Sequence, residues 1–195
     1  MTRRILAALA VVLAIGAALS GSSRKADGRV DVNALASDIE RENDHVTAVE
    51  LAEWIKARKA GLRVIDVRSD SEYQDFHIPT AERIPLSGLS SLKPAPNETL
   101  VLYSEGGAHA AQGWILLRAT GHRNVFFLRG GLLDWMDDIM RPVIPEKAAN
   151  APADSANAYH ASLSRYFGGV PHVGGTPSEA EEARATVAHG KRRGC

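Results

Sequence analysis

Several short stretches of this chain are apolar almost throughout, and each is followed by a segment with helical spacing. The predicted strands cover residues 46–47, 63–68, 83–86, 99–104 and 125–128, and the predicted helices cover 49–59, 71–75, 87–92, 110–120 and 130–135. Strands without a polar face must be covered on both sides, and helices between them supply the crossovers. The pattern therefore predicts an α/β fold: an open, doubly wound parallel sheet of about five strands with helices on both faces.

Ligands of such sheets bind at the carboxyl ends of the strands. Ser104 ends one predicted strand, and a glycine-rich turn leads from it into a helix that we expect to begin near Ala110. The free N–H groups of a helix start suit an anion or an activated nucleophile. The candidate anion or ligand loop is therefore Ser104, Glu105, Gly106, Gly107, Ala108 and His109.

Three further side chains are candidates for the same cleft. Asp66 and Arg68 end the neighbouring predicted strand, and His77 lies in the loop segment 76–81. We expect Arg68 to pair with a local carboxylate, either Asp66 or Glu72. We expect His77 to bond backbone groups near the cleft. Neither residue is predicted to hold a metal.

The order of these motifs resembles a rhodanese-homology domain, the fold of thiosulfate sulfurtransferases, over residues 45–145. Residues 66–68 (Asp-Val-Arg) resemble the family's Asp-x-Arg, residues 76–81 (Phe-His-Ile-Pro-Thr-Ala) resemble its Gly-His-Ile-Pro-Gly-Ala, and residues 129–131 with Trp135 resemble its closing Gly-Gly-x-x-x-Trp. Active members begin the loop with cysteine, followed by glycine three places on and usually arginine five places on. Here those places hold Ser104, Gly107 and His109.

The resemblance implies sulfur transfer through a thiolate that holds the sulfur as a persulfide. A serine hydroxyl is no anion at neutral pH without a strong base, and it forms no stable persulfide analogue. Glu105 adds a negative charge where an anionic substrate would dock. His109 replaces the arginine's charge only near or below pH ~6.5. No catalytic residue is therefore expected at this loop.

The residues leave more than one function open. The first is a binding or regulatory module for a protein partner or a small anion, or a loop in which Ser104 only caps the next helix. The alternative is a sulfurtransferase or sulfur relay that uses Cys195, whose thiol pKa the basic run 191–193 would lower. A serine hydrolase is a third hypothesis, but its nucleophile elbow requires glycine where Leu102 stands.

The first residues have the pattern of a targeting segment. Arg3 and Arg4 precede an apolar run over residues 5–19. We expect either a signal peptide cleaved after Ser20 or an uncleaved anchor, with membrane contact only through 5–19 in the second case. The rest of the chain would be exported, either periplasmic or anchored to the outer face of the cytoplasmic membrane.

We divide the chain into residues 1–22 (signal peptide or anchor), 23–44 (linker and short helix), 45–145 (rhodanese-like domain) and 146–195 (low-complexity, partly disordered tail with possible short helices). The tail carries an apolar stripe from Tyr159 to Phe167 and a capping box at Thr176. A formal net charge of zero gives no indication of a nucleic-acid partner. One cysteine excludes an intrachain disulfide and a cysteine-based zinc site, and the seven histidines have no metal-binding spacing. No cofactor is predicted.

Overall fold

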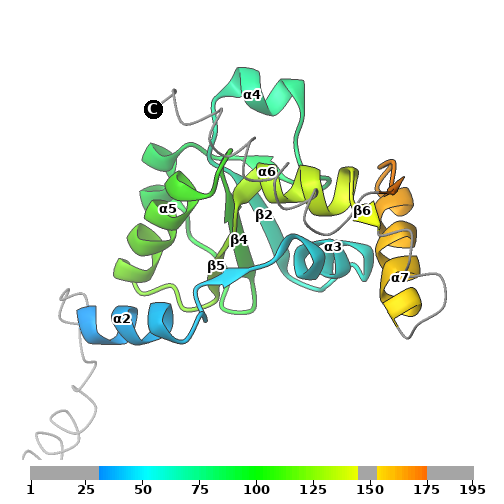
Figure 1. Ribbon diagram of the computed structural model, residues 1–195. Coiled ribbons are helices and arrows are strands. Elements are labelled where there is room, and N and C mark those ends of the chain that lie inside the picture. Colours follow the sequence, from blue (N-terminus) through cyan, green and yellow to red (C-terminus); the bar gives the residue numbers. More distant parts are fainter. Residues whose placement is uncertain (1–30, 145–152, 175–195) are drawn as a thin grey trace, which may run out of the picture. The chain divides into compact units, whose positions relative to one another are not determined.

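The structure is a computed structural model, and it describes residues 31–144 and 153–174. Its main element is one parallel sheet in the order β1-β5-β4-β2-β3 (Figure 1). The strands are β1 (His45–Val46), β2 (Leu62–Asp66), β3 (Glu82–Arg83), β4 (Thr99–Tyr103) and β5 (Val125–Leu128). The predicted parallel sheet of about five strands is confirmed.

Helices connect and cover these strands. The α-helices are α2 (Val32–Glu40), α3 (Ala48–Lys56), α4 (Asp70–Asp75), α5 (Ala108–Ala119), α6 (Gly131–Trp135) and α7 (Ala153–Tyr166). A 3₁₀ helix η1 (Leu86–Ser91) precedes β4, and a π-helical turn η2 (Met136–Met140) continues α6. The short strands β6 (Val143–Ile144) and β7 (His172–Val173) pair in parallel as a second sheet.

The central strand β4 shows why the predicted strands lack a polar face. Val101 and Tyr103 pack in one core with α3, α6 and η2, whereas Leu100 and Leu102 pack in a second core with α5 and η1. All four side chains are fully buried. Burying one such leucine contributes roughly 1.5–3 kcal/mol. Figure 1 shows α3 and α5 on opposite sides of the strands, so helices on both faces are confirmed.

Several boundaries differ from the sequence prediction: β3 ends at Arg83 and not at Leu86, α3 ends at Lys56 and not at Lys59, and two further differences lie at the Ser104 loop and the strand beside it. Helix α5 begins at Ala108, two residues before the predicted start, because Gly107 takes a left-handed φ of +87° and the helix follows it at once. Strand β2 ends at Asp66, two residues early, because the Asp66 carboxylate accepts a hydrogen bond from the backbone N–H of Arg68 (2.9 Å) and turns the chain.

The helices that precede and follow the domain in the sequence, α2 and α7, both pack against it. Leu35 of α2 contacts the second core, and Asp38 forms an ion pair with Arg118 of α5. On α7, Leu163 is 1% exposed, and the ring of Phe167 lies edge-on to Trp135 with centroids 5.1 Å apart.

The predicted helix around the tail's apolar stripe is therefore present as α7 and packs on the domain. The predicted helix at Thr176, the targeting segment and Cys195 all lie outside the described residues. In the described ranges, no helix is both long and apolar enough to cross a membrane.

Candidate functional site

Ser104 lies directly after β4 and is only 3% exposed. Its Oγ accepts a hydrogen bond from the backbone N–H of Ala110, in the first turn of α5, at 3.3 Å. This is one of the N–H groups that a helix start leaves without an intrahelical partner. The Ser104 hydroxyl therefore caps the start of α5 as a hydrogen-bond acceptor.

The rest of the loop presents backbone donors. Within the described residues, no acceptor bonds the N–H groups of Gly106, Gly107, Ala108 or His109. Because α5 is twelve residues long, its aligned peptide dipoles add partial positive charge at this end. The loop can therefore hold a small anion through backbone groups alone.

The α6 turn holds the loop through backbone hydrogen bonds. The carbonyl oxygens of Ser104 and Glu105 accept hydrogen bonds from the N–H groups of Leu132 (2.9 Å) and Leu133 (3.0 Å). This approach requires glycine at position 131, where φ is +62° and a Cβ would lie 2.2 Å from the Ser104 carbonyl oxygen. The residues of the Gly-Gly motif thus fix the loop's backbone.

Asp66 and Arg68 form a buried pair beside the loop. Arg68 donates from Nε and Nη2 to the Asp66 carboxylate at 3.0 and 2.7 Å, and from Nη2 to the carbonyl of Phe76 at 2.6 Å. Burial disfavours the charged guanidinium, but the hydrogen bonds and charge of Asp66 outweigh it, so the pKa of Arg68 is raised. The predicted pairing of Arg68 with Asp66 is present.

Arg68 also connects this pair to the loop. Its Nη1 lies 3.4 Å from Oε2 of Glu105, whose side chain is 40% exposed. A chain of three charges therefore runs from the buried Asp66 through Arg68 to Glu105, and its sum is one negative charge.

Tyr103 adds a neutral hydroxyl to the buried group. Its oxygen accepts a hydrogen bond from the N–H of Ile78 (3.1 Å), and the Arg68 guanidinium lies 5.6 Å from its ring centroid. Burial, and then the adjacent Asp66 carboxylate, raise the pKa of Tyr103 far above its ordinary value. The hydroxyl therefore stays protonated at neutral pH and cannot act as a base there.

The two candidate histidines lie at the surface. His77 is exposed, its Nδ1 lies 2.9 Å from the Tyr73 carbonyl oxygen, and its ring stacks on Tyr73 at 4.1 Å. His109 is exposed in the first turn of α5. Its charge and that of Arg68 both help to lower the pKa of Glu72, after the larger effect of the hydrogen bonds from Ser69. In the part of the chain that the structure describes, no three metal-binding side chains gather.

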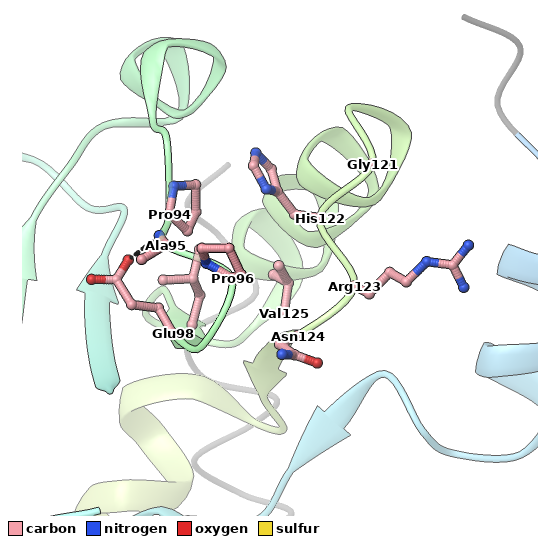
Figure 2. Close-up of a pocket in the computed structure, with 10 residues that line it drawn as sticks. Pro94, Ala95, Pro96, Glu98, Gly121, His122, Arg123, Asn124 and Val125 are labelled. Atoms are coloured by element: carbon pink, nitrogen blue, oxygen red, sulfur yellow. Dashed lines mark hydrogen bonds between the residues drawn. The ribbon is translucent and has the colours of Figure 1, made fainter. Parts of the chain in front are cut away.

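A pocket of about 310 Å³ lies at the other end of the sheet (Figure 2). Leu100 and Val125, at the starts of β4 and β5, line it with Pro94, Pro96 and His122. Figure 2 shows the Arg123 side chain pointing away from the two prolines. The pocket is remote from the Ser104 loop, because β4 runs between them.

Sequence reasoning missed some of the site. It identified the loop, Asp66 and Arg68, but not the carbonyl of Phe76, the hydroxyl of Tyr103 or this second pocket. The proline-containing segment 93–97 was a signal for an irregular loop, but nothing in it indicated a cavity.

Comparisons with known proteins indicate the family of this domain. Residues 47–138 match the family model described as a rhodanese-like domain. The probable adenylyltransferase/sulfurtransferase MoeZ of Mycobacterium tuberculosis is 31% identical over 94 residues, which cover 46% of this chain and 24% of MoeZ. The uncharacterized protein slr1261 of Synechocystis is 35% identical over 91 residues, which cover 46% of this chain and 49% of that protein.

Among solved structures, the rhodanese-like domain of the Anabaena Alr3790 protein is 30% identical and has a TM-score of 0.42. The match covers 47% of this chain and 71% of that structure. The chain thus spans about a quarter and about half of the length of the two curated relatives. Residues 47–138 of this chain are a rhodanese-like domain.

Proposed function

We propose that this chain is an exported, rhodanese-like binding module whose Ser104 loop holds a small anion, or an anionic group of a protein partner, without transferring sulfur. The observation that carries the proposal is the burial and the hydrogen bonding of the Ser104 side chain. Its oxygen is buried and accepts the Ala110 N–H. In the described residues no histidine or carboxylate bonds this hydroxyl.

The name of the MoeZ relative includes sulfurtransferase, and a sulfurtransferase of this fold needs a thiolate at the loop. Serine supplies none. What the loop retains is the set of backbone donors at the start of α5, held in place by the α6 turn. Binding by backbone donors needs no nucleophile, so it survives the loss of the cysteine.

Export is the second part of the proposal. It rests on Arg3, Arg4 and the apolar run 5–19, which predict either a cleaved signal or an anchor. The domain would then act in the periplasm or at the outer face of the cytoplasmic membrane.

A thiosulfate:cyanide sulfurtransferase assay tests the catalytic part. The full chain should form no more thiocyanate than its Ser104→Ala variant. Activity of the unchanged chain well above Ser104→Ala would overturn the proposal. A Cys195→Ser variant belongs in the same series, because loss of a wild-type signal in that variant alone would assign sulfur transfer to Cys195 instead.

Ser104→Cys tests whether the loop itself is intact. If the N–H groups of the loop still stabilise an anion, the new thiol should have a lowered pKa and react with iodoacetamide faster at pH 7 than Cys195 does. The rate for Cys195 is measured in the unchanged chain. A new thiol with the ordinary reactivity of a buried cysteine would contradict an anion-binding loop.

A further inference from the structure

Four cations lie in three loops at the end of the sheet opposite the Ser104 loop. We propose that these loops dock on an anionic lipid surface, so that the Ser104 loop faces away from the bilayer. This proposal rests on the anchored form of the proposed function, and it adds a second membrane contact to the one predicted for residues 5–19.

The three loops precede parallel strands and therefore share one end of the sheet. They are residues 57–61, 93–98 and 121–124, which lead into β2, β4 and β5, and we call them the amino-edge loops. Because the three strands are parallel and adjacent, the loops meet at the amino ends of the strands. Ser104 instead follows the carboxyl end of β4.

The amino-edge loops form a continuous surface. The carbonyl of Gly61, in the first loop, accepts a hydrogen bond from the N–H of Thr99 (2.8 Å), directly after the second loop. The carbonyl of Asn124, in the third loop, accepts one from the N–H of Leu100 (2.9 Å). Figure 2 shows the second and third loops facing each other across the pocket. Cations from separate loops can therefore act on one extended partner.

The charge of these loops is strongly positive, although the net charge of the whole chain is zero. Four exposed cations have no carboxylate partner in the part of the chain that the structure describes: Arg58, Lys59, Lys93 and Arg123. The loops contain one carboxylate, Glu98, and it pairs with Arg63 of β2 at 3.1 Å. Beside the loops, the end of α2 adds Glu40 and Glu42 against Arg41, which leaves the sum positive.

The chain enters the domain beside this surface. Asp38 of α2 pairs with Arg118, whose Nη1 donates to the Arg123 carbonyl at 3.0 Å, so α2 adjoins the third amino-edge loop. Residues 20–30 connect the apolar run 5–19 to the start of α2, and eleven residues span at most about 40 Å. An anchor formed by the apolar run would therefore keep the amino-edge loops within reach of the bilayer.

An anionic bilayer is the partner that fits both the charge and the tether. Each lysine or arginine near such a surface strengthens binding about fivefold, and the attraction falls off within a Debye length. The anchor makes docking an intramolecular step, so a weak attraction per loop is sufficient. A soluble polyanion would benefit from the same cations but not from the tether.

The experiment measures the accessibility of both ends of the domain on vesicles. Ala95→Cys in the second amino-edge loop and Gln74→Cys in α4, beyond the carboxyl end of β2, each place one fluorescent label at an exposed position of the full chain with Cys195→Ser. The chain is reconstituted in vesicles of phosphatidylcholine, alone or mixed with phosphatidylglycerol. Acrylamide, an uncharged quencher, then reports how far each label is exposed to water.

On the mixed vesicles, we expect acrylamide to quench the label at position 95 about threefold less efficiently than the label at position 74, because the docked state is the main one. The two labels should be quenched equally on phosphatidylcholine alone. Raising the salt to about 0.5 M should remove the protection on the mixed vesicles.

Replacement of one cation in each amino-edge loop tests the role of charge. Since three cations are lost, docking should weaken about 100-fold and the label at position 95 should become as accessible as on phosphatidylcholine in the combined variant Arg58→Gln, Lys93→Gln and Arg123→Gln.

Arg123 and Arg129 provide a matched pair, because both are exposed and they directly flank the two ends of β5. Arg123→Gln alone should lower the ratio of docked to undocked chains about fivefold. Arg129→Gln changes the net charge by the same amount and should leave that ratio unchanged.

The outcomes separate this docking from the proposed function. Equal quenching of both labels on the mixed vesicles would overturn the docking and leave the anchor standing. Protection at position 95 that also occurs on phosphatidylcholine alone and grows with the ratio of protein to lipid would overturn it too, since it would show contact between copies of this chain. Failure of the full chain to sediment with either kind of vesicle would overturn the anchored form of the proposed function itself.

Discussion

The carbonyl oxygen of Ser104 accepts a hydrogen bond from the N–H of Leu132 at 2.9 Å, which joins the end of β4 to the start of α6. The Ser104 hydroxyl, on the same residue, accepts from Ala110 at the start of α5. One residue thus bonds to the first turns of two helices. Its backbone and side chain both contribute to the loop's shape.

The glycine at position 131 permits the first of these bonds, and its replacement tests how tightly the turn is packed. Gly131→Ala places a Cβ 2.2 Å from the Ser104 carbonyl oxygen and 2.6 Å from the Gly107 nitrogen, at a φ of +62°. We expect a loss of about 3 kcal/mol in unfolding free energy, measured by urea denaturation, because backbone must move.

Gly121→Ala is the control for the conformational part of that loss. Gly121 has a φ of +94° with no atom within 4 Å of the position of a Cβ. It should cost only about 1 kcal/mol, the penalty for a side chain in the left-handed region. Equal losses in the two variants would contradict the close approach at Gly131.

We expect the Ser104 side chain to stabilise the folded chain through its hydrogen bond with Ala110. Ser104→Ala leaves the buried N–H of Ala110 without its acceptor, so we expect a loss of about 1–2 kcal/mol in unfolding free energy. Ser90→Ala removes an exposed hydroxyl that donates to the Ser87 carbonyl at 3.5 Å and should cost less than about 0.5 kcal/mol. An unchanged midpoint in Ser104→Ala would show that this bond contributes nothing.

The pair of Asp66 and Arg68 should matter more than any surface pair. Asp66→Asn removes the charge partner of a guanidinium whose side chain is only 6% exposed, so we expect a loss of about 3–5 kcal/mol. Glu82→Gln breaks the half-exposed pair with Arg63 (2.6 Å) and should cost less than about 1 kcal/mol. Chemical denaturation of both variants at pH 7 provides the comparison, and similar losses would contradict the buried character of the first pair.

The sequence alone allowed the elements of the sheet to be predicted, because strand burial and helix caps are local signals. The capping box of α4, where Ser69 and Glu72 bond each other's backbone N–H groups, is one such signal. The contact between Arg68 and Glu105 joins residues 37 positions apart, and no periodicity encodes it.

The residues against which the flanking helices α2 and α7 pack could not be predicted from the sequence, because these contacts also join distant parts of the chain. An apolar stripe on α7 predicts that something covers Leu163, but the covering residue can be any apolar group in the chain. The sequence likewise does not say which residues cover Leu35 on α2. The early start of α5 was missed because glycine at position 107 is compatible with a turn, a strand end or a left-handed cap.

The capping boxes also predict how stability depends on pH. Hydrogen bonds from Ser69 lower the pKa of Glu72, and those from Thr47 lower the pKa of Glu50. A carboxyl whose pKa is lower in the folded state stabilises the fold above its unfolded pKa, and this contribution is lost as the pH falls through the folded value. The unfolding free energy should therefore decrease as the pH is lowered from about 5 to about 3.

Glu72→Gln isolates one of these groups. The amide can still accept from the backbone N–H of Ser69, but it does not titrate, so the variant should be less stable than the unchanged chain by about 0.5 kcal/mol at pH 7. The difference should shrink as the pH falls through the lowered pKa of Glu72, because the native glutamate then becomes protonated. Urea denaturation at pH 7, 5 and 3 measures it, and a difference that stays constant over this range would show that the charge of Glu72 contributes nothing to the cap.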